Sequence, residues 1–228
     1  MIGIMSAVPF EITQALLENL VIEDTQHRMR RTFYCGTLSK QKVVVATSGM
    51  GKVRAAARTQ YLLDHYDISS LLFMGVAGAT NPDMCQGDIV IANKVIEHDF
   101  NITGSQDCDQ QGAHWYKSDS NLVEQALKAS DRIGLTNKVH LGTVLTGDQI
   151  IAKQSQKQRL WETFRGDCVE MEGAAVATVC WMNEIPFVLI RAISDLANES
   201  MLEDHTQWLS QSIDRCTSLV IEMIKGMP

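Results

Sequence analysis

Short apolar runs alternate along the chain with longer segments of helical periodicity. The runs Met1–Ala7, Ser70–Met74 and Ile89–Val95 have the length and composition of buried β-strands. Apolar positions at helical spacing predict helices in other segments, namely Glu11–Leu20, Val53–His65, Asn121–Ile133, Lys153–Phe164, Gly173–Trp181 and Asp204–Met227. Because the strands tend to come in pairs before helices, the pattern favours a mixed α/β sheet over a strictly doubly wound one.

The connections between these elements are the first candidates for ligand contact. Thr32–Leu38 and Lys42–Thr47 are predicted strands, and the second leads into a glycine-containing turn at Ser48–Lys52. Gly75–Ala79 is predicted to be a loop of small residues straight after a buried strand, where a ligand can approach the backbone. Asn101–Ser120 is polar and is expected to form a long loop, either a lid or a dimer contact.

Composition and charge exclude several classes of protein. The 228 residues include 20 Lys and Arg against 27 Asp and Glu, so the net charge of −7 does not fit a nucleic-acid-binding protein. No apolar run approaches the roughly 20 residues of a membrane span, and Met1–Val8 lacks the features of an export signal. The six cysteines have no metal-binding spacing and are expected to be reduced. We therefore expect one cytoplasmic domain over residues 1–228, without a metal site or a membrane partner.

The stretch Cys168–Asp195 places acidic side chains at the boundaries of predicted elements. Glu170 and Glu172 stand where a strand gives way to a helix, and Asp195 stands just past the next apolar run. Glu11 follows the first predicted strand in the same way. Ligands of open α/β sheets bind at the carboxyl ends of the strands. Three carboxylates in one such site suit the cleavage of a glycosidic bond, because one can protonate the leaving group, one can activate water and one can accept hydrogen bonds from a vicinal diol.

Two blocks of this chain resemble the signature of the nucleoside phosphorylase and nucleosidase superfamily, namely Val169–Ala174 (VEMEGA) and Arg191–Asp195 (RAISD). Within that superfamily, Ile2–Glu11, Ser48–Val53 and Gly75–Gly78 resemble the bacterial 5′-methylthioadenosine/S-adenosylhomocysteine nucleosidases. The resemblance covers essentially the whole chain. It implies a three-layer α/β/α sandwich with a mixed, partly barrel-like central sheet. It also implies a homodimer that needs no metal and no organic cofactor.

The resemblance also implies catalytic roles for individual residues. Glu11 would orient and deprotonate the attacking water, with Arg191 nearby. Asp195 would protonate N7 of the departing adenine, Glu172 would hold the ribose hydroxyls, and Met171 would pack against the sugar. The implied reaction is hydrolysis of the N-glycosidic bond of 5′-methylthioadenosine, S-adenosylhomocysteine or a related 5′-substituted adenosine.

Further residues are implied to line the pocket. Backbone groups near Ile151 would read the adenine edge, and Ala77 and Gly78 would lie close to the ribose and the base. Glu170 is placed with these substrate-binding residues. The substrate is therefore expected to meet both backbone and side-chain groups.

Three positions depart from the family pattern. Many members have Ser where this chain has Val76, and they usually have a purine-stacking aromatic where this chain has Ile150. The register places His205 where members carry another pocket aromatic. Loss of a stacking ring should weaken purine binding by about 0.5–1.5 kcal/mol and leave the acid–base groups unchanged. The preferred 5′-substituted nucleoside is therefore open, and aminodeoxyfutalosine is one candidate.

Two other functions stay open. A purine nucleoside phosphorylase of the same superfamily must bind phosphate, which favours arginines, and neither Ser6–Glu11 nor Leu71–Met74 contains one. A nucleoside-binding protein that has lost catalysis would be expected to lose Glu11 or Asp195, and both are present.

Overall fold

The computed structural model describes residues 1–100 and 114–227, except for the side chain of His205. The expected pocket contribution of His205 therefore lies outside the described residues, as does most of the predicted loop Asn101–Ser120. None of the described helices combines the length and the apolar character that crossing a membrane requires.

The described strands belong to one mixed sheet and are β1 (Ile2–Ser6), β2 (Leu20–Arg28), β3 (Arg31–Leu38), β4 (Gln41–Thr47), β5 (Ser70–Ala79), β6 (Ile89–Glu97), β7 (His114–Lys117), β8 (Val139–Thr146), β9 (Cys168–Glu170) and β10 (Phe187–Asp195). Their order is β10-β6-β8-β9-β5-β1-β4-β3-β2, and β7 pairs with β6. β10 also pairs with β5, so β5, β10, β6, β8 and β9 close into a ring from which the other strands extend. The predicted mixed, partly barrel-like sheet is confirmed.

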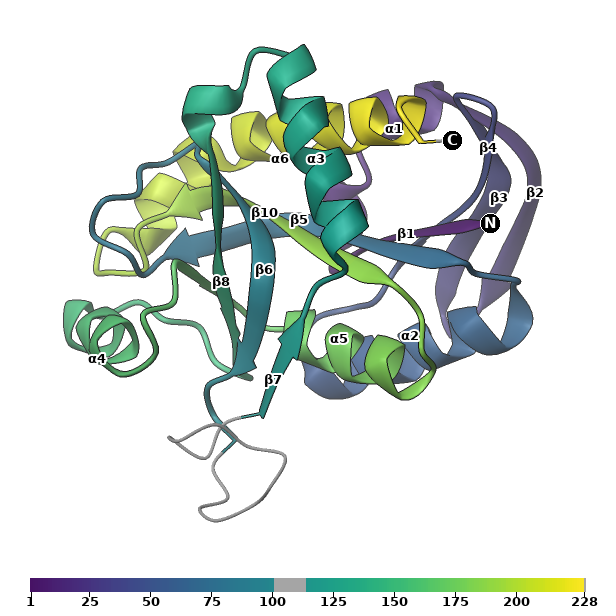
Figure 1. Cartoon of the computed structure of the whole chain (residues 1–228). Helices are drawn as coiled ribbons and strands as arrows, with labels where there is room; N and C mark the ends of the chain where they lie inside the picture. The colour runs from purple at the N-terminus through teal and green to yellow at the C-terminus, as the bar shows by residue number, and fades with distance from the viewer. Residues whose placement is uncertain (101–113, 228) are drawn as a thin grey trace.

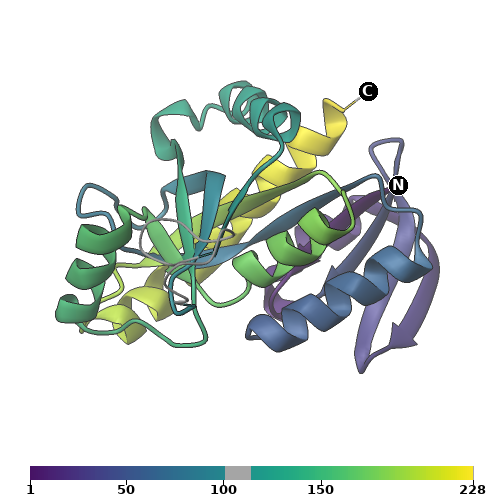
Figure 2. The same cartoon turned by 60° about the horizontal axis from the view of Figure 1, so that its bottom comes forward.

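The described α-helices are α1 (Gln14–Glu18), α2 (Lys52–His65), α3 (Ser120–Arg132), α4 (Gln154–Phe164), α5 (Gly173–Met182) and α6 (Met201–Lys225), with short 3-10 turns at Pro9–Glu11 and Thr136–Lys138. α1, α3 and α6 pack on one face of the sheet and α2 and α5 on the other (Figure 1). Figure 2 shows α2 and α5 next to each other on their face. α4 packs at the end of the ring through Leu160, against Ile151 and Val169. The three layers that the family resemblance implies are therefore present.

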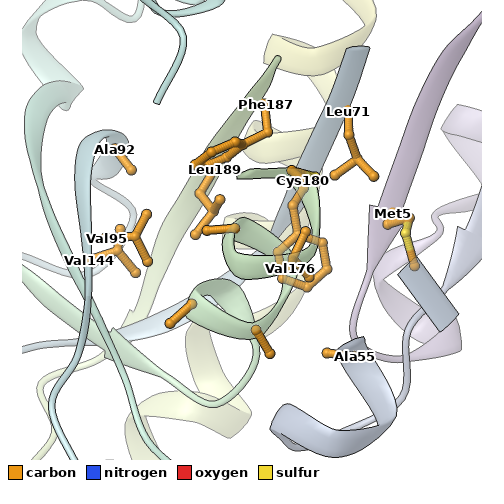
Figure 3. Packing of buried hydrophobic residues seen from close by; sticks show 14 of the residues in the cluster. Met5, Ala55, Leu71, Ala92, Val95, Val144, Val176, Cys180, Phe187 and Leu189 are labelled. Carbon is orange, nitrogen blue, oxygen red and sulfur yellow. The ribbon is translucent and has the colours of Figure 1, made fainter. Parts of the chain in front are cut away.

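α5 is apolar on all sides because residues 173–177, 179 and 180 are buried, whereas Trp181 and Met182 at its C-terminal end are exposed. Val176 and Cys180 point into a cluster that also contains Leu71 of β5 and Leu189 of β10 (Figure 3). A Cβ on Gly173 would lie only 2.3 Å from Leu189 Cδ2, so the first turn of α5 contacts β10 closely. Removing a large apolar side chain from such a core typically costs about 2–5 kcal/mol, so Leu189 helps to hold the start of α5 in place.

Two predicted boundaries near the N-terminus are wrong. The predicted helix Glu11–Leu20 is a 3-10 turn at Pro9–Glu11 followed by the five-residue α1. Leu20 instead begins β2, an outer strand that pairs with β3. Most side chains of β2 are exposed, so its apolar pattern is too weak to identify it locally, and pairing with β3 decides its conformation.

The predicted loops Gly75–Ala79 and Asn101–Ser120 also need correction. β5 continues through Ala79, because Gly75 to Gly78 pair with β10 and the last residues pair with β9. Residues 114–117 of the second loop form β7, which pairs with the end of β6. In both places pairing with another strand, β10 and β9 in the first and β6 in the second, converts a segment without local periodicity into sheet.

Candidate active site

A cavity of about 340 Å³ opens at the carboxyl ends of β1, β5 and β10, which run parallel to one another. Of the site residues predicted from the sequence, all but Arg191 and His205 line it: Glu11, Val76, Ala77, Gly78, Ile150, Ile151, Glu170, Met171, Glu172 and Asp195. Arg191 is buried behind the cavity wall, and the His205 side chain is outside the described part of the chain. Five separate segments of sequence thus converge on one site.

Glu11 is held in the cavity wall by backbone amides. Its Oε2 accepts hydrogen bonds from the amides of Ala7 (2.8 Å) and Val8 (3.0 Å), and its Oε1 accepts one from Val76 (3.0 Å). Burial raises the pKa of Glu11 above its usual value, although Arg191 and the three amides act in the opposite direction. A fixed carboxylate with raised basicity suits a general base near neutral pH.

Glu170 and Arg191 form a buried ion pair beneath the cavity. Glu170 Oε2 lies 2.8 Å from Arg191 Nη2, and the Arg191 guanidinium lies over the Phe73 ring at 4.2 Å. The Thr146 hydroxyl donates to Glu170 Oε1, and the amide of Gly173 donates to both carboxylate oxygens. Glu170 lines the cavity, but its carboxylate is engaged by Arg191 and by the first turn of α5. Substrate contact by Glu170 stays a prediction.

Glu172 connects the start of α5 to the glycine-containing turn before α2. Its Oε1 accepts a 2.7 Å hydrogen bond from the amide of Gly51. Burial, followed by the nearby Glu170 carboxylate, raises the pKa of Glu172 to about 8, while Gly51 and Arg191 act to lower it. At neutral pH this carboxyl group is therefore mostly protonated.

Asp195 is held at the end of β10 by its own neighbours in sequence. Ser194 Oγ donates a 2.8 Å hydrogen bond to Asp195 Oδ2, and the amide of Ala197 donates a 3.0 Å hydrogen bond to Oδ1. The residue is only 6% exposed, yet it lines the cavity. A buried carboxyl group in this position can exchange a proton with a bound ligand.

Two glycines of β5 allow the carboxylates of Glu11 and Asp195 to approach the same strand. A Cβ at Gly75 would lie 2.6 Å from Glu11 Oε1, and a Cβ at Gly78 would lie 2.6 Å from Asp195 Oδ1. These positions are three residues apart, which corresponds to roughly 10 Å along a strand. Glu11 and Asp195 therefore contact β5 at separate points and line one cavity.

The departures from the family pattern lie at different depths. Val76 is half-buried and its amide holds Glu11, so the missing hydroxyl affects the side chain and not this backbone contact. Ile150 is 65% exposed at the cavity rim, whereas its neighbour Ile151 is buried. The cavity rim at position 150 is therefore more open than an aromatic ring there would make it.

Several residues of the site are missed by reasoning from the sequence. Thr146 ends β8, and its Oγ1 accepts a 2.8 Å hydrogen bond from the Ala174 amide while donating to Glu170. Its position at the end of a predicted strand is the one signal that would have found it. Further apolar residues also line the cavity, among them Val8, Phe10, Met50, Met201 and Leu202. Nothing local marks them, since they meet only through the packing of separate loops.

The chemistry available in this cavity is that of acids and bases. Among the described residues, no three His, Cys, Asp or Glu side chains are grouped so as to hold a metal ion. The cavity instead combines a carboxylate held by backbone amides, Glu11, a largely protonated carboxyl group, Glu172, and a buried Asp195. Such a set can transfer protons at two places on one ligand and bind a diol between them.

Comparisons with known proteins agree with this geometry. Residues 1–225 match the model of the Phosphorylase superfamily. The chain is 30% identical over 234 residues to the 5′-methylthioadenosine/S-adenosylhomocysteine nucleosidase of Mycobacterium bovis, covering 92% of this chain and 91% of that protein. It is 32% identical over 229 residues to the aminodeoxyfutalosine nucleosidase of Campylobacter jejuni, covering 99% of each. It superposes with a TM-score of 0.92 on the Neisseria meningitidis nucleosidase in complex with methylthio-immucillin-A, with 28% identity and 99% of each chain covered.

Proposed function

We propose, from the premise that this chain belongs to the 5′-methylthioadenosine/S-adenosylhomocysteine nucleosidase family of the phosphorylase superfamily, that its cavity hydrolyses the N-glycosidic bond of a 5′-substituted adenosine. The observation that carries the proposal is the placement of two differently held carboxyl groups, Glu11 and Asp195, against separate points of β5 in one cavity. The products are adenine and the 5′-substituted ribose.

Glu11 is the proposed base for the attacking water. Its three backbone hydrogen bonds fix the carboxylate, and its raised pKa makes it a better proton acceptor. As the water oxygen bonds to C1′ of the ribose, one water proton moves to Glu11. Arg191 lies behind this carboxylate and compensates the negative charge of the buried acids.

Asp195 is the proposed acid for the leaving group. As the bond between C1′ and N9 breaks, its electron pair passes to the adenine ring, and N7 accepts the proton of Asp195. The hydrogen bonds from Ser194 and Ala197 stabilise the carboxylate that remains. Proton donation at N7 makes adenine a neutral leaving group.

Between these two groups, Glu172 is proposed to bind the ribose hydroxyls, with Met171 packed against the sugar. Both line the cavity, and the amide of Gly51 orients the Glu172 carboxyl group. Ile151 and Ala77 are proposed to border the adenine, with Ile150 at the exposed edge of the base. The apolar residues Val8, Phe10, Met50 and Leu202 favour an apolar 5′-substituent such as a methylthio group.

Phosphorolysis is disfavoured by the charges around the cavity. Among the described residues that line it, none is a lysine or an arginine. The carboxylate of Glu11 stands where a phosphate would have to approach, and Arg191 is engaged by Glu170. A phosphate ion would therefore meet repulsion and no bidentate partner.

A homodimer is the proposed assembly. α2 and α5 lie side by side on one face, where Asn183 Nδ2 donates a 2.9 Å hydrogen bond to Gln60 Oε1 (Figure 2). This face exposes Val53 (80%), Trp181 (65%) and Met182 (69%). Large exposed apolar side chains along one face favour burial against a second copy.

The test of the proposed activity is adenine release from 5′-methylthioadenosine, with and without phosphate. We expect release that does not depend on phosphate, and we expect Asp195→Asn to abolish turnover while retaining substrate binding. Strictly phosphate-dependent release would replace hydrolysis by phosphorolysis. Tight binding without release would instead identify a nucleoside-binding protein.

A further inference from the structure

The turn that follows Asp195, at the end of β10, has a constrained backbone conformation. Ala197 has a φ of 52°, in the left-handed region that non-glycine residues rarely adopt. Its amide donates the hydrogen bond to Asp195 Oδ1, and its side chain is completely buried. The orientation of the Asp195 carboxyl group therefore depends on what holds this turn in place.

Lys157 of α4 reaches this turn from outside the sheet. Its Nζ donates a 3.0 Å hydrogen bond to the carbonyl oxygen of Leu196, the residue between Asp195 and Ala197. Lys157 is only 8% exposed and forms no ion pair with any side chain in the described part of the chain. Burying an ammonium group is costly unless nearby groups compensate its charge, so this placement requires an explanation.

The groups that compensate the charge of Lys157 are the Leu196 carbonyl and Asp195. Burial lowers the pKa of Lys157, and the Asp195 carboxylate acts to raise it. α4 is tied to the same loop at a second point, because the amide of Gln154 donates a 3.1 Å hydrogen bond to Glu199 Oε1. α4, which follows Ile150 and Ile151 in the sequence, is thereby connected to the turn and loop that follow Asp195.

We propose that Lys157 is a positioning residue for the general acid Asp195. Its hydrogen bond to Leu196 keeps the turn in the conformation that presents Asp195 to the cavity. Its charge favours the carboxylate that Asp195 becomes when it gives its proton to N7 of adenine. Lys157 itself neither gains nor loses a proton in this step. The inference rests on the proposed function of Asp195.

The charge of Lys157 matters most after the proton has moved. Asp195 then carries a negative charge in a buried site with little water, where a fixed positive charge acts more strongly than in solvent. A purely structural lysine would need only its hydrogen bond to the Leu196 carbonyl. The two roles therefore differ in whether the charge is required.

Two substitutions separate the charge from the hydrogen bond. Lys157→Gln retains a donor for the Leu196 carbonyl without the charge, and Lys157→Arg retains both. Lys153→Gln is the matched control, because Lys153 is exposed at the start of the same helix. Phosphate-independent adenine release from 5′-methylthioadenosine gives kcat and KM, and thermal denaturation shows whether each variant is folded.

We expect Lys157→Gln to lower kcat by roughly 3- to 100-fold, the range of couplings between neighbouring residues, with KM within about twofold of the unsubstituted protein. Lys157→Arg should restore most of kcat, and Lys153→Gln should have no effect. In an Asp195→Asn background, which binds substrate without turning it over, Lys157→Gln should leave the dissociation constant of 5′-methylthioadenosine unchanged.

Normal kcat in folded Lys157→Gln would overturn the inference. A parallel loss of kcat and melting temperature that Lys157→Arg does not restore would also overturn it, because it would indicate a structural anchor only. Weaker binding of 5′-methylthioadenosine caused by Lys157→Gln in the Asp195→Asn background would overturn it as well, because it would assign Lys157 a role independent of Asp195. Failure of the unsubstituted protein to release adenine would refute the proposed function itself, so the two failures are distinguishable.

Discussion

Glu170 Oε2 lies 2.8 Å from Arg191 Nη2, and the two side chains are only 3% and 2% exposed. Each is a charge that would be costly to bury alone, so each depends on the other. The pair stands behind Glu11 and below the first turn of α5, which Glu170 also holds through the Gly173 amide. The ion pair therefore supports the proposed base and the proposed sugar-binding residue from the same place.

Glu170→Gln should destabilise the protein by roughly 3–5 kcal/mol, because it leaves the Arg191 charge buried without its ionic partner. For a chain of this size, each kcal/mol corresponds to about 2–4 °C in melting temperature. Thermal denaturation measures the effect, with Glu162→Gln on the exposed side of α4 as the control. An unchanged melting temperature would show that Glu170 is not what stabilises the buried guanidinium.

Glu172→Gln should flatten the dependence of stability on pH between about pH 5 and pH 8. The pKa of Glu172 is raised from 4.5 to about 8 in the folded protein, by burial and by Glu170, so the folded state retains a proton that the unfolded state has lost. Its contribution to stability is therefore fully present below pH 4.5 and is lost as pH rises through about 8. Melting temperatures at several pH values test this. The expectation fails if both proteins lose stability equally as the pH rises.

Ile150→Phe should strengthen substrate binding, because it places an aromatic ring at the exposed base side of the cavity. A stacking contact of about 0.5–1.5 kcal/mol corresponds to a KM lower by roughly 2- to 10-fold, with kcat little changed. Leu202→Phe is the control, since Leu202 is also exposed at the rim (74%). Equal effects of the two substitutions would argue against stacking on the purine at position 150.

Val53→Arg should convert the proposed dimer into a monomer, because it places a charge in the exposed apolar face of α2 and α5. The mass in solution, measured by light scattering after size-exclusion chromatography, reports the change. Val21→Arg is the matched control, because Val21 is similarly exposed (67%) but lies on β2. A dimer that persists in Val53→Arg, or dissociates in Val21→Arg, would place the interface elsewhere.

The sequence by itself determined most elements, and most of the site residues predicted from it line the cavity. Apolar runs and helical spacing identified β1, α2, α3, α4, α5 and α6 to within a few residues, because burial of one face imposes a local period. The blocks around Glu172 and Asp195 carried the family resemblance, and the resemblance predicted that Glu11 belongs to the same site. All three residues line one cavity. Local sequence patterns predict the structure correctly where residues close together in the sequence determine the conformation.

Only the tertiary structure decided the closure of the ring, the partners of the buried charges and the depth of each carboxyl group. The end of β5 is a strand because β9 and β10, about 90 to 120 residues further along the chain, pair with it, and β2 is a strand because its neighbour β3 pairs with it. Glu170 and Glu172 are two positions apart, yet one is paired with Arg191 and the other has a pKa near 8. Nothing in the sequence indicated that Lys157 contacts the backbone carbonyl of Leu196, next to Asp195. Pairing, burial and electrostatic environment depend on which segments pack together, and no local period encodes that information.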